Sequence, residues 1–258
     1  MPEKILTLLL PFIGTVLGAG TVFIVKKNLK DSVMKSFNGF AAGVMFAAAI
    51  WSLIIPSFEF SEDKGKLAFI PVVVGLVLGF LFLMLLDKVV PHQHIESDET
   101  EGISCNLKKT TMTSLAVALH NLPEGIAVGV VLASSSVSQA VPISMAIALS
   151  IGIAIQNFPE GAIISLPLRQ CGIKKEKTFV LGVLSGAVEP IAALITMLFI
   201  GVITPALPYL LSFAAGAMIF VVVEELIPEM TKGKHSHFGT VFFFVGFMLM
   251  MVLDVVLN

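Results

Sequence analysis

Long apolar runs separated by short polar connections make up most of the chain. A helix needs about 20 apolar residues to cross roughly 30 Å of hydrocarbon. Eight stretches have that length, at residues 5–25, 33–57, 67–90, 111–134, 141–168, 178–201, 205–229 and 238–257. The runs are continuous, whereas a membrane β-barrel has short alternating strands. The pattern therefore predicts an all-α polytopic membrane protein with eight transmembrane helices.

Composition supports this class. Hydrophobic residues make up 56% of the 258 residues and charged residues only 13%, against about 25% in soluble domains. The first run has full span length and no small-residue cleavage pattern after it, so we do not expect a cleavable signal. We expect one transmembrane domain over residues 1–258, with the lipid bilayer as its environment and no nucleic-acid partner.

The distribution of basic residues predicts the orientation. Thirteen of the 16 lie in the connections after the first, third, fifth and seventh spans or at their edges: Lys26, Lys27, Lys30, Lys35, Lys88, Lys108, Lys109, Arg169, Lys174, Lys175, Lys177, Lys232 and Lys234. By the positive-inside rule these connections are cytoplasmic. Both termini are then extracytoplasmic, in a multi-pass protein of the cell (inner) membrane. Residues 91–110 form a cytoplasmic loop with a histidine-containing segment.

Two pairs of spans resemble each other. "FAAGVMFAAAIWSLIIP" begins at Phe40 and "FAAGAMIFVVVEELIP" at Phe213, while "GFLFLMLLDKVV" from Gly79 matches "GFMLMMVLDVVL" from Gly246. Spans 1–3 are then repeated as spans 6–8. Two spans intervene, so the repeats have opposite orientations. Such inverted repeats are typical of secondary transporters, whose substrate site lies near the midplane.

The two intervening spans carry a polar motif in apolar surroundings, "HNLPEG" in span 4 and "QNFPEG" in span 5. Residues four apart share a helix face, so His120 lies with Glu124 and Gln156 with Glu160. Asn121 and Asn157 point to an adjacent position. The prolines in each motif disturb the helix, and Gly125 and Gly161 permit close approach of a neighbouring helix.

Three glutamates in the middle of the spans are the strongest indication of function. A proline kink or a single histidine is compatible with a purely structural role, but a charged side chain at mid-membrane costs on the order of 3 kcal/mol. Glu124, Glu160 and Glu189, the last in "GAVEPIAAL", all occupy such positions, and no lysine or arginine lies in the middle of a span. Protons or metal ions must balance them, and the added imidazole and amides favour metal.

The ligand types limit which metal ions the site is suited to bind. Imidazole with carboxylate and amide oxygens, and no cysteine in any span, points to a borderline divalent ion. We expect Zn²⁺ as the transported substrate, with Fe²⁺, Mn²⁺ or Cd²⁺ also admissible. The lack of thiolates fits a site that releases its ion.

The paired motifs, the "VEP" of span 6, the eight spans and the histidine-bearing loop together resemble the ZIP family of zinc and iron transporters, its bacterial branch in particular. The resemblance implies uptake of divalent metal into the cytoplasm through a two-metal site by alternating access, with spans 1, 4, 5 and 6 moving against the others, and a homodimer. It implies that one metal is held by His120, Glu124, Gln156 and Glu160. It implies that the other is held by Asn121, Glu124, Asn157, Glu160 and Glu189. Many family members have histidine at position 156 and an acid at position 157, so we expect weaker binding at the second position.

The resemblance also implies residues that line the entrance and the exit of the metal pathway. The exit-side candidates are Asp87, His92, His94 and Glu225. The entrance candidates are Asp254, which is the repeat equivalent of Asp87, together with Ser52 and Met45. For Asp254 a solvated helix end fits equally well, and for Met45 core packing fits better.

Two other functions remain open at this point. A proton- or sodium-coupled cation exchanger would use the acids and not His120. An intramembrane metal hydrolase is disfavoured because the chain has no HExxH motif and no evident nucleophile. We therefore predict a metal transporter and not an enzyme.

Overall fold

The computed structural model describes residues 2–25, 30–91, 109–137, 141–170, 172–200 and 206–257. All regular elements in these ranges are helical, which confirms the all-α prediction. The helices are α1 (Pro2–Gly20), α2 (Asp31–Ala48), α3 (Ile55–Glu59), α4 (Phe69–Val89), α5 (Lys109–Val137), α6 (Ile143–Gln170), α7 (Lys175–Gly186), α8 (Val188–Ile200), α9 (Leu207–Val221), α10 (Ile227–Thr231) and α11 (Phe238–Leu257).

Seven helical stretches among the described residues are long and apolar enough to cross a membrane. They match all the predicted spans except the fourth, which corresponds to α5. At 1.5 Å per residue, the 29 residues of α5 are also sufficient to span the hydrocarbon. The sixth predicted span is interrupted at Ala187, between α7 and α8. The count of eight spans is consistent with the structure and stays a prediction.

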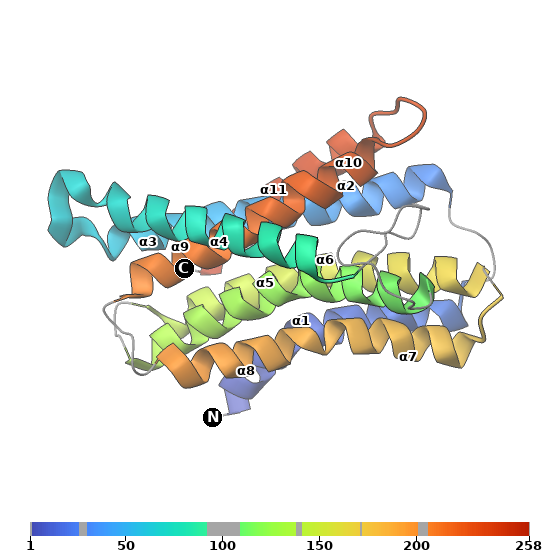
Figure 1. The fold of residues 1–258 in the computed structure, drawn as a ribbon, viewed down its shortest axis with the longest axis horizontal. Helices are drawn as coiled ribbons and strands as arrows, with labels where there is room; N and C mark the ends of the chain where they lie inside the picture. The colour runs from blue at the N-terminus through green and yellow to red at the C-terminus, as the bar shows by residue number, and fades with distance from the viewer. Residues whose placement is uncertain are drawn as a thin grey trace.

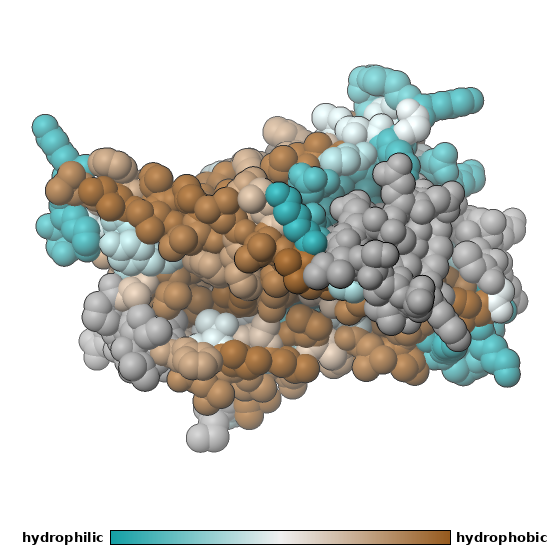
Figure 2. Space-filling model, viewed as in Figure 1, coloured by the Kyte–Doolittle hydropathy of each residue, from teal (hydrophilic) through white to brown (hydrophobic). Residues whose placement is uncertain are grey.

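The helices form two layers (Figure 1). One layer, which we call the α6 block, contains α1, α5, α6, α7 and α8; the other, the α2 block, contains α2, α3, α4, α9, α10 and α11. Both chain termini lie toward the same end of the long axis (Figure 1), which is compatible with the predicted eight spans. Apolar side chains cover the middle of the visible surface and hydrophilic residues collect toward its two ends (Figure 2), which is the distribution expected of a protein surrounded by lipid.

Glycines bring helices together backbone to backbone inside each block. In the α6 block, Gly14 and Gly18 of α1 face the backbone of α6, and Gly125 of α5 faces the backbone of α8 at Glu189. In the α2 block, Gly43 faces the backbone of α11 and Gly79 that of α9. Small residues are the usual means of close packing in lipid, where apolar burial between helices gives little driving force. The predicted close approaches at Gly125 and Gly161 are confirmed.

Two π-helical turns occur at corresponding places in the proposed repeat. One covers Ala49–Ile54, between α2 and α3, and the other covers Val222–Leu226, between α9 and α10. Each is followed by a proline at the start of the next short helix, Pro56 or Pro228. Single π turns inside helices are frequent at functional sites. Their correspondence agrees with an inverted repeat, which stays a prediction.

The glycine contacts can be tested with a pair of alanine variants. Gly43→Ala would place a Cβ against the Phe243 carbonyl and force α2 from α11, whereas a Cβ at Gly20 meets nothing within 4 Å. We expect Gly43→Ala to lower the free energy of unfolding by about 1–3 kcal/mol, as overpacking does. Gly20→Ala should leave the Tm unchanged or slightly higher. Thermal unfolding in detergent measures both, and equal Tm values would contradict the close packing.

Candidate metal centre

The two halves of the paired motif lie on long neighbouring helices. α5 continues through Pro123 and α6 continues through Pro159, so neither proline ends its helix. Glu189 lies in the first turn of α8, directly after the interruption at Ala187. The interruption allows α7 and α8 to present different faces to α5 and α1.

These helices bring together Glu124, Gln156, Asn157, Glu160 and Glu189. We add the buried Asn121, which precedes Glu124 by three residues on α5, and call these six polar residues the central group. Asn121, Glu124, Gln156 and Asn157 are 0% exposed, and Glu189 is 1% exposed. Glu160 is partly buried. Burial of this many polar side chains in a membrane span is costly and is characteristic of a functional site.

The members of the central group interact across the helices. The Gln156 amide donates a hydrogen bond to Glu124. Asn157 lies beside both Glu124 and Glu189, and the three carboxylates are close enough to repel one another if all are charged. Two like charges in a low-dielectric interior destabilise the protein unless a cation or proton balances them.

Hydrogen bonds from outside the group hold its outer edge. The Asn121 side-chain amide donates to the Ser185 carbonyl at 3.1 Å, and the Asn157 amide points to the Pro11 carbonyl at 3.4 Å. The Thr15 hydroxyl donates to Glu189 Oε1 at 3.0 Å. Each asparagine uses its NH₂ group in this way, which leaves its amide oxygen for other contacts.

One oxygen of every member of the central group has no hydrogen-bond partner within the described part of the chain. These atoms are Asn121 Oδ1, Glu124 Oε2, Gln156 Oε1, Asn157 Oδ1, Glu160 Oε1 and Glu189 Oε2. Buried polar atoms are almost always hydrogen-bonded in proteins. A cluster of buried oxygen acceptors without donors is chemically suited to bind a cation.

No three histidine, cysteine, aspartate or glutamate side chains among the described residues are placed to hold one ion by themselves. The available oxygens come instead from carboxylates mixed with amides. His120, predicted to join Glu124, contacts Glu225 in the structure through its Nε2. The His120 imidazole of α5 is therefore in contact with the α2 block, where Glu225 lies.

The predicted entrance residues are partly brought together. The Ser52 hydroxyl donates to Asp254, and both side chains are buried, although they lie 202 residues apart in sequence. The alternative of a solvated helix end does not apply to Asp254. Met45 is 1% exposed and belongs to the main hydrophobic core, as core packing predicts.

The predicted exit residues lie only partly in the described ranges. Asp87 is partly buried near the end of α4. His92 and His94 lie outside the described residues, as does most of the loop over residues 91–110. The predicted cluster of Asp87 with these histidines stays a prediction.

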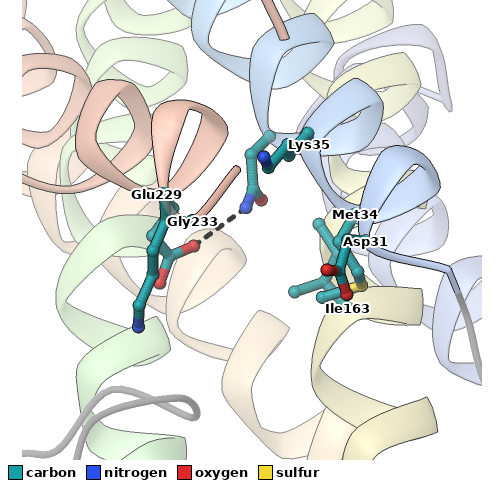
Figure 3. Close-up of a pocket in the computed structure, with 8 residues that line it drawn as sticks. Asp31, Met34, Lys35, Ile163, Glu229 and Gly233 are labelled. Carbon is teal, nitrogen blue, oxygen red and sulfur yellow. Dashed lines mark hydrogen bonds between the residues drawn. The ribbon is translucent and has the colours of Figure 1, made fainter. Parts of the chain in front are cut away.

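A polar cavity of about 220 Å³ lies beyond Glu160, between the start of α2 and the end of α10. Figure 3 shows Glu229 on one side of it and Asp31 with Met34 on the other, and marks the hydrogen bond that Asn38 donates to Glu229 at 3.0 Å. Ile163, which lines the cavity, is three residues after Glu160, and Glu229 is close enough to interact electrostatically with Glu160. The cavity therefore begins about one helical turn from the central group.

Sequence reasoning missed Glu229 and Thr15. Glu229 follows Glu225 by four residues, and this spacing places the two on one helix face, so the signal was available. Thr15 had no comparable signal, because a threonine in an apolar helix is usually bonded to its own backbone.

Comparison with known proteins shows the family of the chain. A model of the ZIP zinc transporter family matches residues 92–254, more than half of the chain. The chain belongs to the ZIP family. It is 35% identical to zinc transporter ZIPB of Bordetella bronchiseptica, over 96% of this chain and 79% of the relative. It is 33% identical to zinc transporter GufA of Myxococcus xanthus, over 95% and 96%, and 31% identical to zinc transporter ZIP11 of Homo sapiens, over 93% of each.

Removal of one charge from the central group is expected to stabilise the metal-free protein. In Glu160→Gln a neutral amide replaces a carboxylate that faces Glu124, Glu189 and Glu229. We expect a gain of about 1–2 kcal/mol in unfolding free energy, or ~2–4 °C in Tm, as is common when a functional site is neutralised. The same variant should lose the rise in Tm that added zinc gives the unmodified protein. Glu62→Gln, at an exposed position between α3 and α4, is the control, and a lower metal-free Tm for Glu160→Gln would contradict the argument.

Proposed function

We propose that this ZIP family member carries divalent metal ions, zinc foremost, from the outside of the cell into the cytoplasm by alternating access. The observation that carries the proposal is the set of buried oxygens in the central group that have no hydrogen-bond partner in the part of the chain that the structure describes. Three of them belong to glutamates, and the middle of every span lacks lysine and arginine. A divalent cation binds the oxygens that lack hydrogen-bond donors and balances the excess negative charge.

The ligand types support zinc with incomplete selectivity. ZIP11, GufA and ZIPB, the three relatives compared above, are zinc transporters. The central group offers carboxylate and amide oxygens, and His120 adds an imidazole at its edge. Zinc accepts nitrogen and oxygen ligands, while an oxygen-rich site also accommodates harder ions such as Mn²⁺. Fe²⁺, Mn²⁺ and Cd²⁺ are therefore secondary substrates in the proposal.

The proposed roles follow the two motif halves. Glu124 and Glu160 are shared between two neighbouring metal positions. His120 and Gln156 complete the first position, and Asn121, Asn157 and Glu189 complete the second. The amide of Gln156 is a weaker zinc ligand than imidazole, but the first position keeps His120. Asn157 offers a neutral amide where a carboxylate would add a charge, so the second position is the weaker one.

The division into blocks supports the proposed movement. Every member of the central group lies on the α6 block, whose helices are joined backbone to backbone, and Glu225 faces His120 from the α2 block. Sliding of one block against the other carries the ligands as a unit. Access then changes from one side of the membrane to the other without dismantling the site. The contact of His120 with Glu225 crosses this moving boundary.

The direction of transport is proposed from charge and the polar cavity. The positive-inside rule assigns the cavity end of α2 and α10 to the cytoplasm, with both termini outside the cell membrane. The cavity next to Glu160 then provides the release path, with Glu229 as its first carboxylate. Entry is proposed on the opposite side, past Ser52 and Asp254. A homodimer stays a prediction from the family resemblance.

Zinc flux into liposomes that contain the purified protein tests the proposal. His120→Ala and Glu160→Ala each remove a ligand and should reduce the initial rate by more than about tenfold, since even groups that only support a ligand change metal affinity by 10–100-fold. His237→Ala and Glu62→Ala remove the same side chains from exposed positions and should transport as the unmodified protein does.

Other results would identify another function. Zinc flux no greater than in empty liposomes would reject transport. Proton flux that ignores zinc and survives His120→Ala would indicate the exchanger. Hydrolysis that requires metal, without flux, would indicate an enzyme.

A further inference from the structure

Helix α1 contacts the central group at two points on one of its faces. The Thr15 hydroxyl donates to Glu189 Oε1 at 3.0 Å, and the Pro11 carbonyl faces the Asn157 amide at 3.4 Å. Positions 11 and 15 are four residues apart and so share a face. α1 therefore contributes the outer support for two of the residues at the second metal position, although it carries no acidic or histidine side chain there.

The hydrogen bond of Thr15 is unusual for a helical threonine. Such a hydroxyl commonly bonds the carbonyl three or four residues earlier in its own helix. Thr7 does this on the same helix, donating to the Glu3 carbonyl at 2.9 Å. Thr15 instead reaches a carboxylate 174 residues away in sequence, and its side chain is 0% exposed.

Close packing holds Thr15 in place. Gly161 of α6 lies against the Thr15 backbone, and Gly186 at the end of α7 lies against the Thr15 side chain. A β-branched side chain also has few rotamers in a helix. The donor is therefore fixed in position before any ion arrives.

The consequence is an asymmetric carboxylate. Oε1 of Glu189 accepts the Thr15 hydrogen bond, while Oε2 has no hydrogen-bond partner among the described residues. A hydrogen bond to one oxygen of a carboxylate makes that oxygen a weaker ligand, so coordination through the other oxygen is favoured. Zinc in proteins is usually four-coordinate, whereas larger and harder ions take six or more oxygens and readily use both oxygens of one carboxylate.

We propose that Thr15 is a positioning residue that determines ion specificity: its hydrogen bond restricts Glu189 to one ligating oxygen and so favours zinc over ions of higher coordination number. The inference rests on the proposed function, because it assumes that Glu189 ligates the substrate. It predicts that removal of the hydroxyl frees Oε1 and shifts preference from Zn²⁺ toward Mn²⁺.

The test compares zinc and manganese binding to purified protein by calorimetry, followed by flux of each ion into liposomes. Thr15→Val keeps the shape and removes the hydroxyl, and it should raise the Mn²⁺-to-Zn²⁺ affinity ratio by roughly five- to tenfold, the net size expected for one typical hydrogen bond. Thr15→Ser retains the donor and should keep the original ratio. Thr7→Val removes a buried hydroxyl from the same helix away from the centre and should also keep it.

A ratio that is unchanged in Thr15→Val, or changed equally in Thr15→Ser, would overturn the inference. If Thr15→Val fails to fold, Thr15→Ala compared with Thr15→Ser isolates the same hydroxyl and decides the question. Binding without flux in the unmodified protein would reject the proposed transport. The Mn²⁺-to-Zn²⁺ affinity ratio of Thr15→Val would still test the role of Thr15. Absence of binding to either ion would reject both.

Discussion

The direct contact between helix backbones at glycines sets the geometry of the whole molecule. In lipid the apolar effect does little to hold one helix against another, so close van der Waals packing must do so. The contacts of Gly14 and Gly18 of α1 with α6, and of Gly125 of α5 with α8, fix four helices around the central group. Larger side chains at these points would separate the helices that carry Glu124, Glu160 and Glu189, and the oxygens would no longer share one small volume.

This rigidity also explains how a costly cluster of carboxylates is tolerated. The Ser185 and Pro11 carbonyls and the Thr15 hydroxyl hold one side of the central group, while one oxygen of each of its members has no hydrogen-bond donor among the described residues. These hydrogen bonds keep the side chains from rotating toward other hydrogen-bond donors within the protein. The oxygens without partners thereby remain available to bind an ion. The metal-free protein is less stable as a result, and this loss of stability is needed for function.

Much of this could be predicted from the sequence, because apolar run length and helical periodicity are local properties. They predicted the helical class and seven of the spans, whereas the grouping of Glu124 with Gln156 came from the family resemblance. They did not give the partner of His120, because periodicity says which residues share a face and not which helix lies opposite. The contact with Glu225 depends on how the two blocks meet, and that of Thr15 with Glu189 on the packing of α1 against α7 and α8.

The two π-helical turns have a further consequence for how the path is made. A π turn contains one residue more than an α turn, so the helix beyond it is rotated by about 100° relative to an uninterrupted α-helix. Ser52 lies in one such turn and Glu225 in the other. Deletion of a single residue there would restore regular winding and redirect every later side chain of that helix. Each of the two helices thus uses one surplus residue to aim a polar side chain, Ser52 or Glu225, at the protein interior.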